Sequence, residues 1–345
     1  MIIYFCKVKY FFRKFKGKRI FSFRYFNLSL HFLQEEQIIM EQKKVRYADT
    51  LKSADTEETL DLWLYRPLGY AWALLFRWLR IPPNPVTVVS IFIGVAAGVL
   101  FGYSDLFHNV IGMALLVTAN SLDSADGQLA RMTGQKTRIG RILDGMCGNI
   151  WFITIYIALC IRMQHEGFSG WIWVLGSIAG ASHIQQAQMS DYYRNIHLYF
   201  IKGKEGSEVD RAVNVRRMFQ ELRWSKNLIQ KIMMAFYLNY TNQQEMLSPA
   251  LQRFMDCIRD RFGDDVPHWL RDEFRTKNKP LMKYTNMLTF NTRVIALFIS
   301  MFLQRPWLYF VFELTVLNIM LLYMIMKQES ISRYFYQKLN DGAEK

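Results

Sequence analysis

Three aspartates stand at spacings that would bring their carboxylates together. Asp123 and Asp126 are three residues apart, so on a helix they share one face, and Asp144 follows beyond a short polar turn. If the flanking segments form a helical hairpin, Asp144 returns to the level of the other two. Carboxylate oxygens suit Mg²⁺ or Mn²⁺, which also bind phosphate. The spacing therefore predicts a metal site for phosphate chemistry, with these three aspartates as its ligands.

Small and basic residues around the acids favour the same chemistry. Gly127 and Gly140 lack the side chain that would hold a phosphate away from the helix backbone. Arg131, one turn after Asp126, is placed for a charged hydrogen bond to that phosphate. The alternative is that the acids are ordinary helix-end charges that reach water. Three acids with glycines at these positions exceed what a helix end requires, so we favour the ligand site.

The elements that must position these residues are apolar. Six stretches approach the roughly 20 residues that a helix needs to cross a membrane. The first four contain no Asp, Glu, Lys or Arg, whereas Arg293 and Glu313 interrupt the last two. This pattern predicts an all-α integral membrane protein with six transmembrane helices. The predicted spans are residues 86–102, 106–122, 145–161, 167–190, 287–304 and 307–326.

Basic residues predict the orientation of these helices. Arg131, Lys136, Arg138 and Arg141 fall in the turn between the second and third spans, and the turns on the opposite side hold few basic residues. Cytoplasmic loops carry the excess of Lys and Arg, so this turn and both termini should be cytoplasmic. Residues 65–81 mix Trp, Tyr, Leu and Arg before a proline-rich break, which is typical of an amphipathic helix on the membrane surface.

Composition divides the chain into six segments. The first is rich in Lys and Phe without a steady period, and we expect translation to begin at Met40; the alternative is a basic, aromatic membrane anchor. A long polar stretch between the fourth and fifth spans predicts a helical cytoplasmic insert, whose role no motif indicates. The segments are a non-native or untranslated leader (1–39), a polar leader (40–64), the amphipathic helix and spans one to four (65–195), the insert (196–286), spans five and six (287–327) and a cytoplasmic tail (328–345).

Charge and cysteine content exclude several functions. The net charge of +14 lies where topology places basic residues, and no recognition motif accompanies it, so we expect no nucleic-acid partner. The four cysteines lack metal-type spacing, which excludes a disulfide scaffold or a zinc finger. A small-molecule transporter is an alternative with six spans, but no matched halves or paired broken helices are evident.

The acidic stretch resembles the signature of the CDP-alcohol phosphatidyltransferase family, D-x2-D-G-x2-A-R-x8-G-x3-D-x3-D. The matching residues are Asp123, Asp126, Gly127, Ala130, Arg131, Gly140 and Asp144. The resemblance implies transfer of a phosphatidyl group from a CDP-linked lipid such as CDP-diacylglycerol to a polar alcohol, with release of CMP in phospholipid biosynthesis. It also implies a homodimer, two Mg²⁺ or Mn²⁺ ions on the three aspartates, and a CDP site lined by Gly127, Ala130, Arg131 and Gly140.

One position departs from the signature, because its fourth aspartate falls on Gly148. The resemblance implies a metal ligand and general base there, and glycine is neither. Another group supplies the base, or the metal binds differently, or the protein is a catalytically silent relative that binds the CDP-linked lipid. His183 and Asp191 are the candidate substitute bases, with a structural role as the alternative for each.

Basic residues expected at the same depth bear on the acceptor. Arg194 and Arg293, with Arg138, Arg141 and Lys283, would form a positive pocket that favours an anionic acceptor such as inositol phosphate or glycerol phosphate. Bacterial phosphatidylinositol phosphate synthases are similar in this lining. The alternative is topological charge that contacts anionic lipids. We therefore expect an enzyme of a bacterial inner membrane, with membrane lipids as further partners.

Overall fold

The computed structural model describes residues 47, 53, 55–135, 137–203, 207 and 209–341, except the side chains of residues 138 and 139. Contacts divide the chain into Met1–Asp49 and Thr50–Lys345. The first unit is described only at Tyr47, so the expectations for residues 1–39 and for a start at Met40 fall outside the described residues. In the second unit every regular element that is described is a helix, which confirms the all-α prediction.

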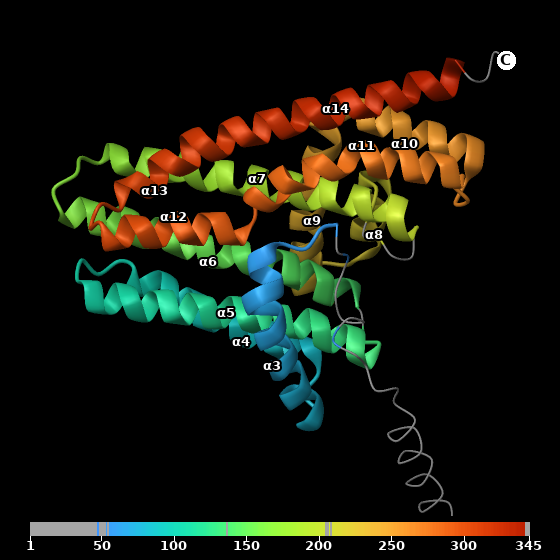
Figure 1. Ribbon diagram of the computed structural model, residues 1–345. Coiled ribbons are helices and arrows are strands. Elements are labelled where there is room, and N and C mark those ends of the chain that lie inside the picture. The colour runs from blue at the N-terminus through green and yellow to red at the C-terminus, as the bar shows by residue number, and fades with distance from the viewer. Residues whose placement is uncertain are drawn as a thin grey trace, which may run out of the picture. The chain divides into compact units, whose positions relative to one another are not determined.

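The described helices follow one another with short connections (Figure 1). The first group begins with a π-helical turn (Asp61–Tyr65) and continues with α3 (Arg66–Trp78), α4 (Pro83–Leu100), α5 (Leu106–Thr133), α6 (Arg138–His165) and α7 (Trp171–Lys202). The predicted insert forms α8 (Ala212–Glu221), α9 (Leu228–Met246), α10 (Pro249–Phe262) and α11 (His268–Met287). The chain ends with α12 (Phe290–Phe302), α13 (Trp307–Phe312), a second π-helical turn (Glu313–Leu317) and α14 (Asn318–Asp341).

Helix caps define the hairpin that α5 and α6 make. The Asp105 carboxylate begins α5 by accepting a hydrogen bond from the backbone N–H of His108 at 3.0 Å. Gly134 ends α5 with φ of +69°, a left-handed conformation that glycine adopts without strain. The Thr137 hydroxyl then accepts from the backbone N–H of Gly140 at 3.0 Å and begins α6. The chain thus reverses within a few residues, which returns α6 alongside the acidic end of α5.

Three helical stretches are long and apolar enough to cross a membrane, namely Pro83–Leu100, Gly140–His165 and Trp307–Asp341. The first overlaps the predicted first span, and the other two contain the predicted third and sixth spans. The other predicted spans fall on α5, α7 and α12, which do not meet that criterion among the described residues. The six-span count therefore remains a prediction. So does the surface role of residues 65–81, which fall largely on α3, a helix that exposes Trp78 and Leu74.

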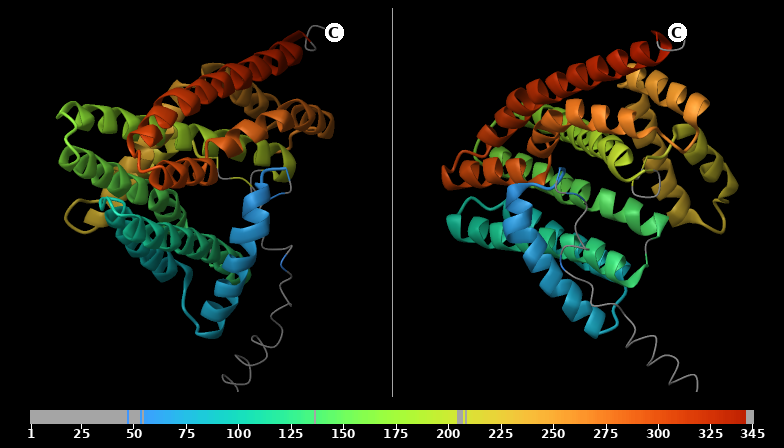
Figure 2. Two further views of the ribbon diagram at one scale, coloured as in Figure 1. Left: turned by 60° about the vertical axis from the view of Figure 1, so that its left-hand side comes forward. Right: turned by 45° about the vertical axis from the view of Figure 1, so that its right-hand side comes forward.

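Two helices continue beyond the segment boundaries expected from composition. Helix α7 runs past residue 195 to Lys202, and α14 runs past residue 327 to Asp341. Their far ends bury aromatic rings against the insert, because Phe200 stacks on Phe274 of α11 at 3.8 Å between centroids and Phe335 stacks on Phe254 of α10 at 5.6 Å. Figure 2 shows α10 and α11 beside this end of α14. The insert therefore shares one apolar core with the helices that precede and follow it.

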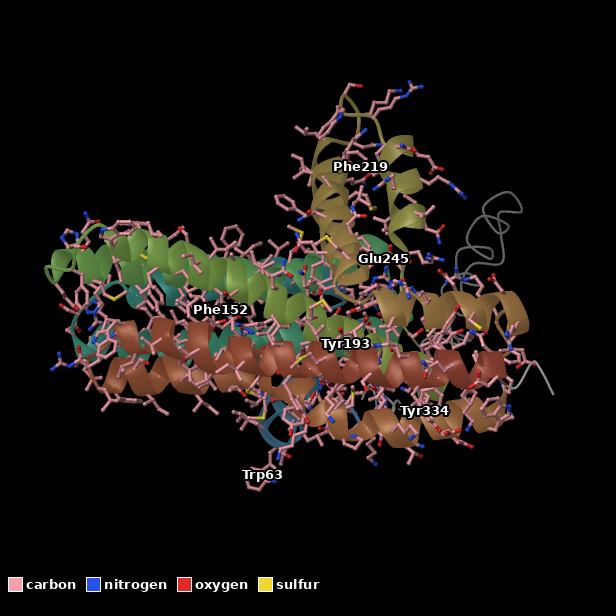
Figure 3. The ribbon with its side chains drawn as sticks, turned by 90° about the horizontal axis from the view of Figure 1, so that it is seen from above. Trp63, Phe152, Tyr193, Phe219, Glu245 and Tyr334 are labelled. Carbon is pink, nitrogen blue, oxygen red and sulfur yellow. The ribbon has the colours of Figure 1, made fainter. Side chains whose placement is uncertain are left out.

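The pair α8 and α9 is placed differently from the rest of the insert. It projects to one side of the long helices, with Phe219 toward its outer part (Figure 3). Its inner side packs on α6, where Ile142 joins Val215 and Met234 in a small apolar cluster. Trp63, 85% exposed, points outward on the opposite side of the molecule in the same view.

Close packing of α4 against α6 depends on a glycine. The Trp151 ring of α6 is 1% exposed and lies directly on Gly94 of α4, where an added Cβ atom would overlap the indole. The indole N–H donates to the backbone carbonyl of Ser90 at 3.1 Å, which fixes the ring in place. The absence of a side chain at residue 94 is therefore what lets the two helices meet.

The substitution Gly94→Ala is expected to destabilise the fold by about 1–3 kcal/mol or more, since the buried ring cannot move aside without breaking its hydrogen bond. Thermal unfolding in detergent measures the effect. Gly170→Ala is the matched control, because an added Cβ there meets nothing within 4 Å. Equal melting temperatures for the two variants would contradict the packing argument.

Candidate active site

The three aspartates predicted as metal ligands lie together at one end of the α5–α6 hairpin. Asp123 and Asp126 come from α5 and Asp144 from α6, and one ligand oxygen of each lies within 4.8 Å of the others. Asp123 and Asp144 line a cavity, whereas Asp126 is only 3% exposed behind them. The local hairpin alone accounts for this grouping, as the spacing predicts.

The electrostatics of this cluster favour a bound cation. Burial raises the pKa of Asp126, which lies beyond the predicted span 106–122, and the nearby charges of Asp144 and Asp123 raise it further. The Thr87 hydroxyl of α4 donates a hydrogen bond to Asp126 and favours its ionised form. Three hard oxygen donors at this separation fit Mg²⁺ or Mn²⁺, whose charge offsets the repulsion among them.

The Thr87 hydroxyl gives a test of the metal site that does not depend on activity. We expect Thr87→Val to weaken Mn²⁺ binding by about 10–100-fold, because a hydrogen bond that orients a ligating carboxylate is lost. Titration of the purified protein with Mn²⁺, followed by electron paramagnetic resonance, measures the affinity. Thr118→Val, which removes a hydroxyl bonded only to its own helix, should leave the affinity unchanged. Equal affinities of wild type and Thr87→Val would contradict this role.

The cluster opens into a central cavity of about 710 Å³ that draws its walls from across the fold. The lining comes from the π-helical turn before α3, from α5, α6, α7 and α9, and from the start of α12. Of the residues expected to bind substrate or act as base, the structure places the following in the lining: Gly127, Arg131, Arg141, Asp144, His183, Asp191, Arg194 and Arg293.

Two expected substrate residues stand apart from this lining, and the side chain of a third is not described. Ala130 is not among the lining residues. Gly140 is also absent from the lining, and an added Cβ there would lie 2.7 Å from Asn84 Oδ1 and 2.9 Å from Thr137 Oγ1, so its small size serves helix packing. The side chain of Arg138 lies outside the described residues.

The arginines of the cavity carry hydrogen bonds within the protein. Arg141 forms an ion pair with Asp210, and its guanidinium also lies 3.4 Å from the Tyr237 hydroxyl. Arg194 donates to Asn286 Oδ1 at 3.4 Å. The charge of Arg141 is therefore partly neutralised by a carboxylate from the segment before α8, which the sequence pattern does not indicate.

Arg293 belongs to a buried network. Its guanidinium donates to His183 Nδ1 at 2.6 Å, to Glu313 Oε1 at 3.2 Å, to Gln186 Oε1 at 2.7 Å and to the Leu288 carbonyl at 3.0 Å. Because an arginine always donates, His183 Nδ1 is the acceptor and the ring proton sits on Nε2. These bonds fit a structural role for both residues, which is the alternative given for His183, and a role for either residue at the substrate stays a prediction.

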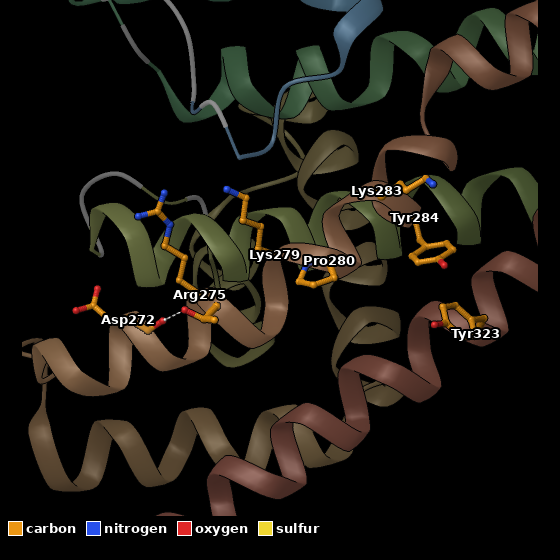
Figure 4. A pocket seen from close by; sticks show the side chains of 8 residues that line it. Asp272, Arg275, Lys279, Pro280, Lys283, Tyr284 and Tyr323 are labelled. Atoms are coloured by element: carbon orange, nitrogen blue, oxygen red, sulfur yellow. Dashed lines mark hydrogen bonds between the residues drawn. The ribbon is translucent and has the colours of Figure 1, made fainter.

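Lys283 lies elsewhere. It lines a groove along α11 with Arg275, Lys279 and Tyr284, and Tyr323 of α14 completes that groove (Figure 4). Lys283 is not among the residues that line the central cavity. The sequence predicts Lys283 in a positive pocket with Arg194 and Arg293, whereas in the structure it lines this separate groove.

Gly148 faces the cavity one turn after Asp144. It is among the lining residues, and an added Cβ at this position meets nothing within 4 Å. The position therefore has room for a side chain, and its lack of a carboxylate is not imposed by packing.

The polar leader and the insert contribute cavity residues that no sequence pattern predicts. Asp61, on the turn before α3, lines the cavity and accepts a hydrogen bond from Asn291 Nδ2 at 2.8 Å. Glu58 accepts from the same amide at 2.6 Å, and burial raises its pKa. Tyr237 and Tyr240 line the opposite side from α9. No local motif marks these residues, because their side-chain hydrogen bonds join segments that are 27 or more residues apart in the chain.

Comparison with known proteins bears on the same part of the chain. Residues 80–190 match the family model described as CDP-alcohol phosphatidyltransferase. That stretch contains the three clustered aspartates, Gly148 and most of α4 to α7, and it ends before the insert begins. Searches of curated proteins and of solved structures give no match for the chain.

Proposed function

We propose, on the premise that residues 80–190 form a CDP-alcohol phosphatidyltransferase domain, that the protein transfers a phosphatidyl group from CDP-diacylglycerol or a similar CDP-linked lipid to a polar alcohol. The domain itself supports phosphatidyl transfer from a CDP-alcohol. The observation that carries the fuller proposal is the cluster of three carboxylates at the wall of the central cavity, inside the matched residues.

The cavity residues suggest how the donor is held. Gly127 and Arg131 line the wall beside Asp123, so a pyrophosphate can approach the α5 backbone and meet a guanidinium. A divalent cation on the aspartates supplies charge neutralisation for that pyrophosphate. The acceptor hydroxyl oxygen forms a bond to the phosphorus that carries the lipid, the bond from that phosphorus to the CMP oxygen breaks, and the hydroxyl proton passes to a base.

The acceptor in this proposal is a polar alcohol, with inositol phosphate or glycerol phosphate as the first choice. Arg131 and Arg194 in the lining support an anionic acceptor. The ion pairs of Arg141 with Asp210 and of Arg293 with Glu313 reduce the positive charge that remains for it. An assay should therefore compare these two anionic acceptors with a neutral alcohol.

The membrane arrangement in this proposal has six spans, with both termini and the aspartate cluster at the cytoplasmic side of a bacterial inner membrane. The basic turn between α5 and α6 supports that orientation. The surface helix α3 and a homodimer belong to the same proposal. Single cysteines introduced at exposed Gln135 and exposed Ser169, labelled from one side of sealed vesicles, should react from opposite sides.

Release of CMP tests the function directly. Purified protein with Mg²⁺ and CDP-diacylglycerol should release CMP when supplied with inositol phosphate or glycerol phosphate, and more slowly with inositol, choline or ethanolamine. The lipid product of each reaction identifies the acceptor. Gly148 favours one second candidate, a silent protein that binds the CDP-linked lipid. That candidate gains support if the donor binds and no alcohol releases CMP, and counterflow of substrate would instead indicate a transporter.

A further inference from the structure

Any transfer to an alcohol requires a group that accepts the hydroxyl proton. The carboxylates that line the central cavity are the candidates for this group. The described lining contains five: Asp61, Asp123, Asp144, Asp191 and Asp210. Asp123 and Asp144 belong to the candidate metal cluster. Asp210 is paired with Arg141 and accepts from the Tyr237 hydroxyl at 2.9 Å, while Asp61 accepts from the Asn291 amide. The position of Asp191 distinguishes it from these four.

Contacts between α6 and α7 define how the two antiparallel helices face each other. An added Cβ at Gly176 would overlap Cys160, so these residues are opposite one another. One turn further, a Cβ at Gly180 would lie 3.6 Å from the Tyr156 ring. A turn beyond that, the His183 and Phe152 rings lie 4.4 Å apart between centroids. Each step of four residues back along α6 is therefore matched by a step of three or four residues forward along α7.

Extending this register by two turns identifies the partners at the active site. Gly148 comes to lie opposite Ala187, and Asp144 opposite Asp191. Asp191 lines the cavity together with Ala187 and Arg194, one turn to either side of it on α7, so this part of α7 borders the cavity. This register thus brings the Asp191 carboxylate across the cavity from the three aspartates. Its helix, α7, faces the turn of α6 at which Gly148 has no side chain.

The insert holds this carboxylate in place. The Tyr240 hydroxyl of α9 donates to Asp191 Oδ2 at 3.4 Å. Helix α9 is itself tied to α7 one turn away, where Gln244 Nε2 donates to the Gln188 carbonyl at 2.8 Å and Gln188 Nε2 donates to Gln243 Oε1 at 2.9 Å. The insert therefore orients Asp191, which directly follows the matched residues 80–190.

We propose that Asp191 is the catalytic residue that accepts the proton of the acceptor hydroxyl, and that Tyr240 is its positioning residue. The proposal rests on the proposed function. As the hydroxyl oxygen bonds to the lipid-bearing phosphorus, its proton moves to the Asp191 carboxylate. The bond from phosphorus to the CMP oxygen breaks with its electron pair on CMP, so that charge and atoms balance. The acceptor alcohol accordingly occupies the cavity between the three aspartates and α7, and α9 of the insert, which also lines that cavity, determines which alcohols fit.

The test compares Asp191→Asn with wild type on CDP-diacylglycerol and each alcohol of the panel. Asparagine keeps the size and the hydrogen bond from Tyr240 but cannot take the proton. We expect kcat to fall by about 10²–10⁴-fold while the dissociation constant for CDP-diacylglycerol is unchanged, as for loss of a general base. The exposed variant Asp260→Asn on α10 is the control and should keep full activity.

A second variant moves the carboxylate rather than removing it. Asp191→Asn combined with Gly148→Asp places an acid on α6, in open space opposite the original one. We expect kcat of this double variant to be at least about tenfold higher than kcat of Asp191→Asn alone. Tyr240→Phe should lower kcat without changing the KM of the alcohol, because the phenol orients Asp191 and does not bind the donor. A matching rise in KM would assign Tyr240 to binding instead.

The outcomes separate this proposal from the proposed function. If wild type releases no CMP with any alcohol, the function itself fails and Asp191 has no proton to accept. If wild type is active and Asp191→Asn is equally active, the function stands and the role of Asp191 is overturned. Loss of donor binding together with activity in Asp191→Asn would also overturn it, because the residue would then be structural.

Discussion

Replacing Asp144 with asparagine is expected to reduce CMP release about a thousandfold. Asparagine preserves the shape of the side chain but removes one of three charges that lie within 4.8 Å of one another. A bound cation contributes several kcal/mol to phosphoryl-group chemistry, and each increment of about 1.4 kcal/mol is a factor of ten in rate. The measurement is CMP release at saturating Mg²⁺, with Mn²⁺ affinity by titration as a readout independent of activity.

The control for this variant is Asp260→Asn, an exposed acid on α10 away from the cavity. It should match wild type in both measurements. An Asp144→Asn protein that keeps both its Mn²⁺ affinity and its rate would mean that the cluster is not a metal site. Reduced repulsion in the cluster should leave Asp144→Asn at least as resistant to thermal unfolding as wild type, so a loss of rate cannot be ascribed to misfolding.

Replacing Arg293 with methionine is expected to destabilise the protein by about 3–5 kcal/mol, because it leaves Glu313 as a buried charge without its partner. The two side chains are 1% and 0% exposed, respectively, and the guanidinium lies 3.2 Å from the carboxylate. The same substitution removes the hydrogen bonds to His183 and Gln186 that join α12 to α7. Thermal and denaturant unfolding in detergent measure the loss.

A double variant separates this structural role from the substrate role that the sequence suggested. Arg293→Met with Glu313→Leu removes both charges, so it should recover much of the stability that the single variant loses. If Arg293 instead bound an anionic acceptor, Arg293→Met would raise the KM of that acceptor with little change in unfolding. Full recovery of stability with an unchanged KM in the double variant would assign Arg293 to the fold alone.

The grouping of the three aspartates could be predicted from the sequence because most of what forms it is local. Asp123 and Asp126 share a helix face by their spacing, Gly134 ends α5 and Thr137 begins α6, and this hairpin returns Asp144 to them. The all-α fold and the apolar stretches on α4, α6 and α14 follow from composition in the same way. Such features depend on periodicity and caps within a few turns of one chain segment.

The rest of the cavity depends on contacts between distant segments, which no pattern along the chain records. Arg141, Arg194 and Arg293 look alike in a sequence, yet Asp210 pairs with the first and Glu313 with the last. Lys283 lines another groove, along α11. These outcomes follow from how side chains interlock when helices pack.

The helices and the acidic hairpin with its three carboxylates can be predicted from residue types and spacing alone. The hydrogen bond that joins Tyr240 of the insert to Asp191 of α7 cannot, because it depends on how distant helices pack. The physical reason is that helix formation is encoded residue by residue over short distances. The relative rotation of two packed helices is instead decided by the shapes of both surfaces, here by glycines 176 and 180 against Cys160 and Tyr156.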